Sequence, residues 1–165
     1  MSKSAEMVIN EFYKGNGNVI LPIDVVKIAN AHGIKIYRAT FREHLKNDVF
    51  GFIEKNNGIT SIYVNAENSL TRRRFTVAHE LGHYFLHHDD GQELNYLDLR
   101  STKSTIEETE ANRFAAELLM PEEQVRNEYS NLLFPTVDAL ARKFQVSKQA
   151  MKYRLLNLGL SAIDT

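Results

Sequence analysis

One apolar segment organises this chain of 165 residues, and its sequence is Phe75-Thr76-Val77-Ala78-His79-Glu80-Leu81-Gly82-His83-Tyr84-Phe85-Leu86. Its apolar residues recur at helical spacing, which predicts a buried α-helix. Ser69 or Thr71 is placed to cap the start of that helix. The segment therefore puts a His-Glu-x-x-His pattern on a helix in the core of the protein.

The spacing of this pattern is typical of a metal site. On a helix, His79 and His83 are one turn apart and project from the same face, so both imidazoles can bind one ion. Glu80 lies about 60° around the axis from His83, because each residue turns an α-helix by about 100°. From there it can reach a water on the metal without being a ligand. The pattern predicts a zinc hydrolase with two His ligands and Glu80 as general base.

The alternative interpretation is an exposed helix that carries two histidines and a charge by chance. The apolar setting favours the metal site. Gly82 supports it as well, because a glycine inside a helix costs about 1 kcal/mol relative to alanine. The close approach of another backbone would explain why a glycine is kept there.

A third metal ligand must come from elsewhere in the chain. Hydrolytic zinc takes three protein ligands and leaves a position for water. The chain has no cysteine, so this ligand should be His, Glu or Asp. A helix predicted over residues 104–121 offers Glu107, Glu108, Glu110 and Glu117. Periodicity leaves the choice open, with a slight preference for Glu110, and the oxyanion partner is equally open among Tyr63, Tyr96 and His87.

Composition places the chain among ordinary globular proteins. A net charge of -1 predicts no general attraction to nucleic acid or membranes. The absence of cysteine excludes disulfides, thiolate zinc sites and a cysteine nucleophile. The N-terminus shows no apolar signal core, so we expect a cytoplasmic protein that forms one domain over residues 1–165.

The remaining segments predict an α+β fold. Helices are expected over 5–14 and 22–32, and strands over 34–41, 49–54 and 59–64. Asn57-Gly58 predicts a hairpin, so a small antiparallel sheet should precede the metal helix. The run Arg72-Arg73-Arg74 is interpreted as a solvated helix face, and residues 89–103 as a loop. A helix follows over 104–121, and Pro121 can start the next, which runs through Val125 to about Tyr129.

Residues 136–158 predict a helical hairpin that resembles a DNA-binding helix-turn-helix. Its second helix carries Lys148, Gln149, Lys152 and Arg154. However, Gln145 stands where the tight turn often has glycine, and any helical hairpin packed on a domain has this pattern. We therefore favour a structural hairpin, with DNA binding as the alternative.

Three segments together resemble the ImmA/IrrE family of metallo-endopeptidases: Val77 to His83, Glu110 to Pro121, and Leu140 to Leu155. The resemblance implies a zincin-like domain with one Zn²⁺ ion, although Mn²⁺ or Fe²⁺ would suit the same ligands. The family pattern places the third ligand on the glutamate that opens Glu-Ala-Asn-x-Phe-Ala, which is Glu110 here. It also implies an intracellular protein that cuts or inactivates helix-turn-helix repressors and so switches on mobile-element or stress genes.

Two functions follow as hypotheses. The first is a zinc endopeptidase that cleaves a helix-turn-helix repressor. The second is a non-catalytic regulator that binds a repressor or DNA and in which the metal only stabilises the fold. Glu80 favours the first, because a purely structural zinc has no use for a general base.

Overall fold

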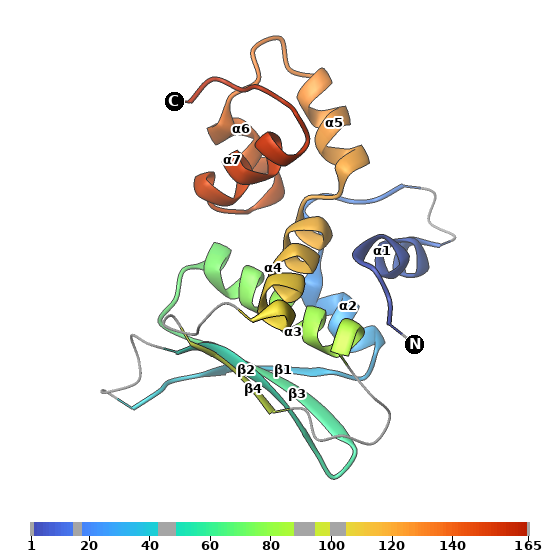
Figure 1. Cartoon of the computed structure of the whole chain (residues 1–165), viewed down its shortest axis with the longest axis vertical. Helices are drawn as coiled ribbons and strands as arrows, with labels where there is room; N and C mark the ends of the chain where they lie inside the picture. The colour runs from blue at the N-terminus through green and yellow to red at the C-terminus, as the bar shows by residue number, and fades with distance from the viewer. Residues whose placement is uncertain (1, 15–17, 43–48, 88–94, 100–104, 165) are drawn as a thin grey trace.

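The computed structural model describes residues 2–14, 18–42, 49–87, 95–99 and 105–164, with backbone only for 95–99. The described residues form an α+β fold, as predicted (Figure 1). The sheet lies at one end of the molecule, α2 and α3 pack on it, α4 packs on α3, and α5, α6 and α7 lie at the other end. The elements are α1 (Ala5–Tyr13), α2 (Val25–Ala31), β1 (Lys35–Ala39), β2 (Val49–Asn56), β3 (Ile59–Asn65), α3 (Leu70–His87), β4 (Asn95–Leu99), α4 (Ile106–Leu119), α5 (Glu122–Ser130), α6 (Val137–Phe144) and α7 (Lys148–Asn157).

The sheet has the strand order β1-β3-β2-β4. The predicted hairpin is confirmed: β2 and β3 pair antiparallel across Asn57 and Gly58, which both have positive φ angles. The prediction of a wholly antiparallel sheet is wrong, because β1 pairs parallel with β3. The hairpin leaves β3 with one free edge, and β1 occupies that edge. A turn signal fixes the partner within a hairpin and says nothing about the strand beyond it.

The other sheet edge also differs from the prediction. Residues 95–99, expected in a loop, form β4, which pairs antiparallel with β2. The rest of the predicted loop lies outside the described residues. One strand of the sheet thus follows the metal helix in sequence. Pairing with β2 supplies the hydrogen bonds of β4, so its own sequence needs little strand pattern.

Side-chain caps set the helix starts. Ser69 caps α3, since its Oγ accepts from the backbone N–H of Arg72 at 3.3 Å. Thr105 caps α4 in the same way, with the N–H of Glu108 at 3.2 Å. The helix predicted from Pro22 begins only at Val25, because Asp24 caps it instead. These caps fix where along α3 and α4 each turn of side chains lies.

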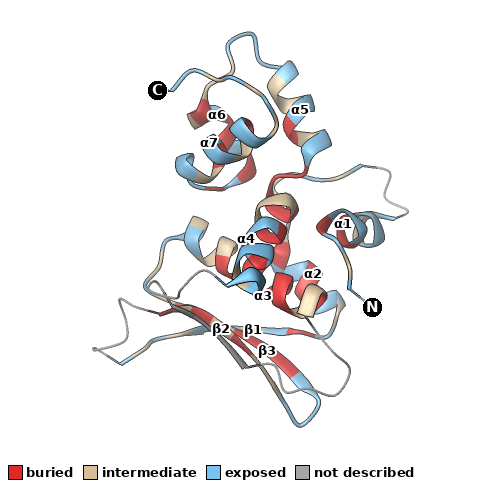
Figure 2. Cartoon of the chain, viewed as in Figure 1, coloured by how far each residue is buried: buried red, intermediate tan, exposed pale blue. Residues whose placement is uncertain are grey.

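Helix α3 is buried along its middle, between the sheet and α4 (Figure 2). Gly82 allows this packing: a Cβ at that position would lie 3.0 Å from the Cα of Ala111 on α4. The predicted close approach of a second backbone is therefore observed. It brings the histidine-bearing face of α3 against the first turns of α4.

The three consecutive arginines do not form a uniformly solvated face. Arg74 is partly buried and donates to the backbone oxygens of Ile23 at 2.9 Å and Gln145 at 3.2 Å. Arg72 is exposed, and its guanidinium stacks on the ring of Phe50, 4.3 Å from the centroid. The prediction of a solvated face is wrong for Arg74, which ties α3 to both neighbouring segments. No helix within the described ranges has the length and apolar character needed to span a membrane.

Candidate metal centre

Two histidines of α3 and one glutamate of α4 converge in the core. His79 and His83 are 2% and 1% exposed, and their Nε2 atoms lie 3.1 Å apart. The carboxylate of Glu108 lies against both, 3.2 Å from Nε2 of His79 and 3.1 Å from Nε2 of His83. One donor atom from each of these residues can therefore reach a common point.

These donors fit a tetrahedral divalent ion. Ligand atoms about 2.0 Å from zinc in tetrahedral geometry are separated by about 3.3 Å. The separations of 3.1 and 3.2 Å among the three side chains are close to that spacing. Two imidazoles and one carboxylate are also a ligand set that hydrolytic zinc sites use. One atom from each of these side chains could thus bind a divalent ion, which would complete its coordination with water.

The protonation state of His83 suits a ligand. Burial, together with the neighbouring His79 and His87, lowers the pKa of His83 to about 3. Its imidazole is therefore neutral at pH 7. Metals bind the neutral ring, so no proton has to be removed from His83 before binding.

The expected third ligand, Glu110, does not reach the histidine pair. Its side chain is 53% exposed, and its carboxylate lies 3.4 Å from Nε2 of His87. Glu110 is two residues beyond Glu108, which turns it about 200° around the helix axis. Because α4 presents the Glu108 face to α3, this expectation is corrected: the structure brings Glu108 to the pair.

The other glutamates of α4 are engaged elsewhere. The carboxylate of Glu117 pairs with Arg113 at 2.9 Å. Hydrogen bonds from its own backbone and from Thr105 lower the pKa of Glu107 at the start of the helix. Neither belongs to the cluster of donors around His79.

Asn112 is a residue of the site that sequence reasoning missed. It lies four residues after Glu108, on the same face of α4, and its Oδ1 is 3.0 Å from Nδ1 of His79. An amide oxygen accepts the Nδ1 proton, which leaves the lone pair of Nε2 for a metal. Such outer hydrogen bonds orient metal-binding histidines. The signal was the four-residue spacing from Glu108, within the Glu-Ala-Asn segment.

The structure describes the side chains of the predicted general base, Glu80, and of two of the three candidate oxyanion partners, Tyr63 and His87. Glu80 is fully buried in α3, next to His79. Tyr63 stacks on Phe52 and alternates in β3 with the buried Ile62, so it lies on the sheet face away from α3. The side chain of Tyr96 lies outside the described part. The ring of His87 is 5.8 Å from that of His83, so of the two candidates whose side chains are described, His87 is the one that lies beside the site.

Comparison with known proteins places the chain in a family. The model of the IrrE N-terminal-like domain, a peptidase family, matches residues 29–156. The chain belongs to this family. The resemblance inferred from the sequence is thereby confirmed, and the match includes α3, α4 and most of α7.

Two relatives are informative. Metallopeptidase ImmA of Bacillus subtilis is 26% identical over 121 residues, which cover 70% of this chain and 69% of the relative. A solved structure described as a Mycobacterium tuberculosis transcriptional regulator is similar with a TM-score of 0.58 and 17% identity. That match covers 92% of this chain but only 46% of the regulator, so this chain spans about half of its length. At this identity the likeness concerns the fold alone.

Proposed function

We propose that the chain is a zinc-dependent endopeptidase in which His79, His83 and Glu108 hold the ion. The observation that carries this proposal is the cluster of donor atoms between α3 and α4: the two Nε2 atoms lie 3.1 Å apart, and one oxygen of the Glu108 carboxylate lies 3.2 Å from His79 while the other lies 3.1 Å from His83. Membership in a peptidase family gives independent support. Other divalent ions such as Mn²⁺ or Fe²⁺ suit the same three side chains.

The chemistry assigns a role to each residue. His79, His83 and Glu108 would hold the ion, and a bound zinc would supply acidification of a water molecule and polarisation of the scissile carbonyl group. Glu80 accepts the proton of the attacking water and delivers it to the leaving amine. Asn112 keeps the Nε2 atom of His79 directed at the ion through the bond to Nδ1. Burial of His79, Glu80 and His83 keeps bulk water away from these three side chains and strengthens their electrostatic effects.

The proposed substrate is a helix-turn-helix repressor, whose cleavage switches on mobile-element or stress-response genes. This part rests on the resemblance to the ImmA/IrrE family and on the similarity to Metallopeptidase ImmA. The prediction of one domain over residues 1–165 belongs to the same proposal. A buried hydrophobic cluster that continues from Ala5 to Leu155 supports it.

The alternative, a regulator that binds DNA through its last helices, is less well supported. Lys148 of α7 pairs with Asp138 at 2.9 Å, and Lys152 pairs with Asp164. Two of the cations that would contact phosphates are thus already neutralised by carboxylates. DNA binding depends on such cations for most of its affinity.

The test is the Glu80→Gln variant, co-expressed with the repressor encoded beside this gene. We expect wild-type protein to cut the repressor, and the variant to bind one zinc but cut at least about a hundredfold more slowly. Glu67→Gln, at an exposed glutamate outside the site, is the matched control and should cut normally. Undiminished cutting by Glu80→Gln would refute the mechanism.

The two hypotheses separate in the same experiment. If Glu80→Gln leaves gene regulation intact while changes at Lys148 and Arg154 abolish it, the non-catalytic regulator is correct. A chelator should stop cleavage by the wild-type protein, because removal of the ion removes both its effect on water and its effect on the carbonyl.

A further inference from the structure

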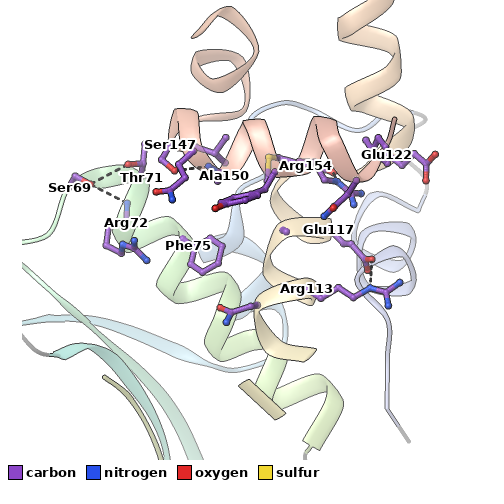
Figure 3. A pocket seen from close by; sticks show the side chains of 18 residues that line it. Ser69, Thr71, Arg72, Phe75, Arg113, Glu117, Glu122, Ser147, Ala150 and Arg154 are labelled. Carbon is purple, nitrogen blue, oxygen red and sulfur yellow. Dashed lines mark hydrogen bonds and ion pairs between the residues drawn. The ribbon is translucent and has the colours of Figure 1, made fainter. Parts of the chain in front are cut away.

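A cleft of about 950 Å³ begins beside the metal centre and runs between α3, α4 and α7 (Figure 3). Two of its lining residues connect it with the site. Phe75 precedes His79 by one turn of α3, and the two rings are 6.4 Å apart. Asn112, which accepts from His79, lines the cleft from α4. A chain that lies in this cleft therefore passes within one helical turn of a metal-binding histidine.

The cleft has an apolar floor. Its members are contributed by α3, the second half of α4, the residue that ends α4, and the first turn of α7: Phe75, Ala116, Met120 and Ala150. In Figure 3, Phe75 and Ala150 both lie in the space between these helices. A floor of this kind offers contact area to an apolar side chain but does not by itself specify one.

The charged groups around the floor are mostly engaged already. Arg113 and Glu117 pair with each other at 2.9 Å, and Glu122 pairs with Arg126 at 2.8 Å. Arg154 donates from Nε to the backbone oxygen of Met120 at 2.9 Å. The two carboxylates of the cleft wall, Glu117 and Glu122, are therefore neutralised by ion pairs within the protein.

Arg72 differs from these groups. Its guanidinium stands 4.3 Å from the ring centroid of Phe50 and 5.7 Å from that of Phe75. No carboxylate of the described residues lies within ion-pairing distance of it. Stacking on aromatic rings fixes the plane of a guanidinium while its N–H groups keep their capacity to bind a carboxylate. The cleft therefore holds a pre-oriented cation beside its apolar floor.

Helix α7 completes the opposite wall with one polar stripe. Gln149, Tyr153 and Asn157 follow each other at four-residue spacing and all line the cleft. Tyr153 is 60% exposed. This stripe belongs to the helix that would read DNA in a helix-turn-helix, but here it faces α3 and α4. A side chain that lines this cleft is placed to contact whatever lies against the catalytic helix.

We propose that the cleft binds an extended segment of the protein substrate that carries an acidic side chain at Arg72 and an apolar side chain on the floor. Gln149, Tyr153 and Asn157 are then specificity-determining residues, and α7 serves to recognise protein. Charge complementarity favours this occupant: among the described residues neither Arg72 nor Arg154 of the cleft pairs with a carboxylate, and Arg154 already donates to the backbone of Met120, so Arg72 is the cation best placed to bind an acidic side chain. The inference rests on the proposed function, since it treats the site beside the cleft as the place of cleavage.

A cleavage profile tests this directly. Zinc-loaded wild-type protein is incubated with a peptide library made from a digested bacterial proteome, and the new termini are identified by mass spectrometry. We expect Asp and Glu to be enriched at one fixed distance from the cut. Arg72→Glu should abolish this enrichment or replace it with Lys and Arg. Arg38→Glu, at an exposed arginine of β1, should leave the profile unchanged.

A second pair of variants tests the role of α7. Tyr153→Ala should change the residues preferred near the cut and lower kcat/KM for the preferred peptides. Leu156→Ala is the matched control, because Leu156 is 74% exposed on the same helix and does not line the cleft. Equal profiles for wild type and both variants would remove α7 from substrate recognition.

Binding without cleavage separates this inference from the proposed function. The probes are two fluorescent pools of capped decapeptides, identical except that one has Asp where the other has Asn. The zinc-loaded Glu80→Gln protein should bind the Asp pool about threefold to tenfold more tightly, and Arg72→Glu should remove this difference. Equal affinity for the two pools overturns the cleft proposal. If the protein prefers the Asp pool but the wild type cleaves no peptide, the proposed peptidase function is refuted while peptide binding in the cleft is supported.

Discussion

At the scale of single residues, Glu108 and Glu110 show how two neighbouring carboxylates acquire different surroundings. Thr105 caps the backbone of Glu108, and the side chain of Glu108 lies between two buried imidazoles. Glu110 lies about 200° further around the helix and meets His87 near the surface. Only the first position gives a carboxylate access to both Nε2 atoms.

Zinc affinity should therefore depend on Glu108 and very little on Glu110. We expect Glu108→Gln to weaken zinc binding more than about a hundredfold, since it removes a charged ligand from a buried site. Glu110→Gln should change the affinity by no more than about threefold. Competition with a chromophoric chelator measures both, and the opposite order of effects would restore Glu110 as the ligand.

Asn112 should matter through His79 and not through contact with substrate atoms. Asn112→Leu keeps a similar volume but removes the acceptor for the Nδ1 proton. Zinc affinity should fall about tenfold to a hundredfold, the usual effect of losing such an outer hydrogen bond. Asn112→Asp, which retains an acceptor, should recover most of this loss. If both variants bind zinc as wild type does, Asn112 has no positioning role.

The sequence predicted part of this site for a physical reason. His79, Glu80 and His83 lie on one helix, so their relative positions follow from helix geometry alone. The third ligand lies on another helix, and its identity depends on how α4 is rotated against α3. That rotation is set by the packing of Gly82 against Ala111, a contact between residues 29 positions apart that periodicity does not contain.

At the scale of elements, the contact between α3 and α4 determines the width of the metal centre. A Cβ at Gly82 would lie 3.0 Å from the Cα and 3.1 Å from the backbone oxygen of Ala111. Both atoms belong to the backbone of α4, so a methyl group there can be accommodated only if the helices separate. His83 and Glu108, on opposite sides of this contact, would then move apart.

We expect Gly82→Ala to destabilise the protein by about 1 to 3 kcal/mol, as overpacking usually does. In a helix without this contact the same change would stabilise the protein by about 1 kcal/mol. The sign of the change in the free energy of unfolding therefore shows whether the contact is tight. Urea unfolding of the metal-free protein measures the free energy. Zinc titration of the variant should also show weaker binding. A stabilised variant with unchanged affinity would contradict the tight contact.

The sheet shows the same limit of sequence reasoning. Asn57 and Gly58 adopt positive φ angles, and this local turn predicted the pairing of β2 with β3. The edges depend on contacts that no local pattern encodes. β1 reaches the free side of β3, and β4 reaches β2 only after the chain has passed through α3. The prediction therefore failed for the two strand pairs, β1 with β3 and β2 with β4, whose members are joined by long stretches of chain.

At the scale of the whole molecule, Arg74 links parts of the chain that are far apart in sequence. From α3 it donates to the backbone oxygen of Ile23, before α2, and to those of Phe144 and Gln145, where α6 ends. Burial lowers the pKa of its guanidinium from the usual arginine value. The helices that form one wall of the cleft are thus attached to the helix that carries the metal ligands.

Removal of this link should affect stability and the geometry of the cleft together. Arg74→Met keeps most of the aliphatic length but leaves the carbonyls of Ile23 and Phe144 without this donor. We expect a loss of about 2 kcal/mol in the free energy of unfolding, because hydrogen bonds to charged groups are worth about 1.5 to 3 kcal/mol each and this site is partly exposed. Amide hydrogen exchange should rise in α6 and α7 before it rises in α3.

Arg73→Met is the matched control for this prediction. Arg73 makes one long bond, 3.4 Å to the backbone oxygen of Ala66, so its loss should cost no more than about 0.5 kcal/mol. Zinc affinity should stay near the wild-type value in both variants, since neither residue touches the ligands, while the acidic preference of the cleft should weaken in Arg74→Met alone. If the two variants unfold at the same urea concentration, then α6 and α7 are held to α3 by apolar packing, and the position of the cleft wall does not depend on Arg74.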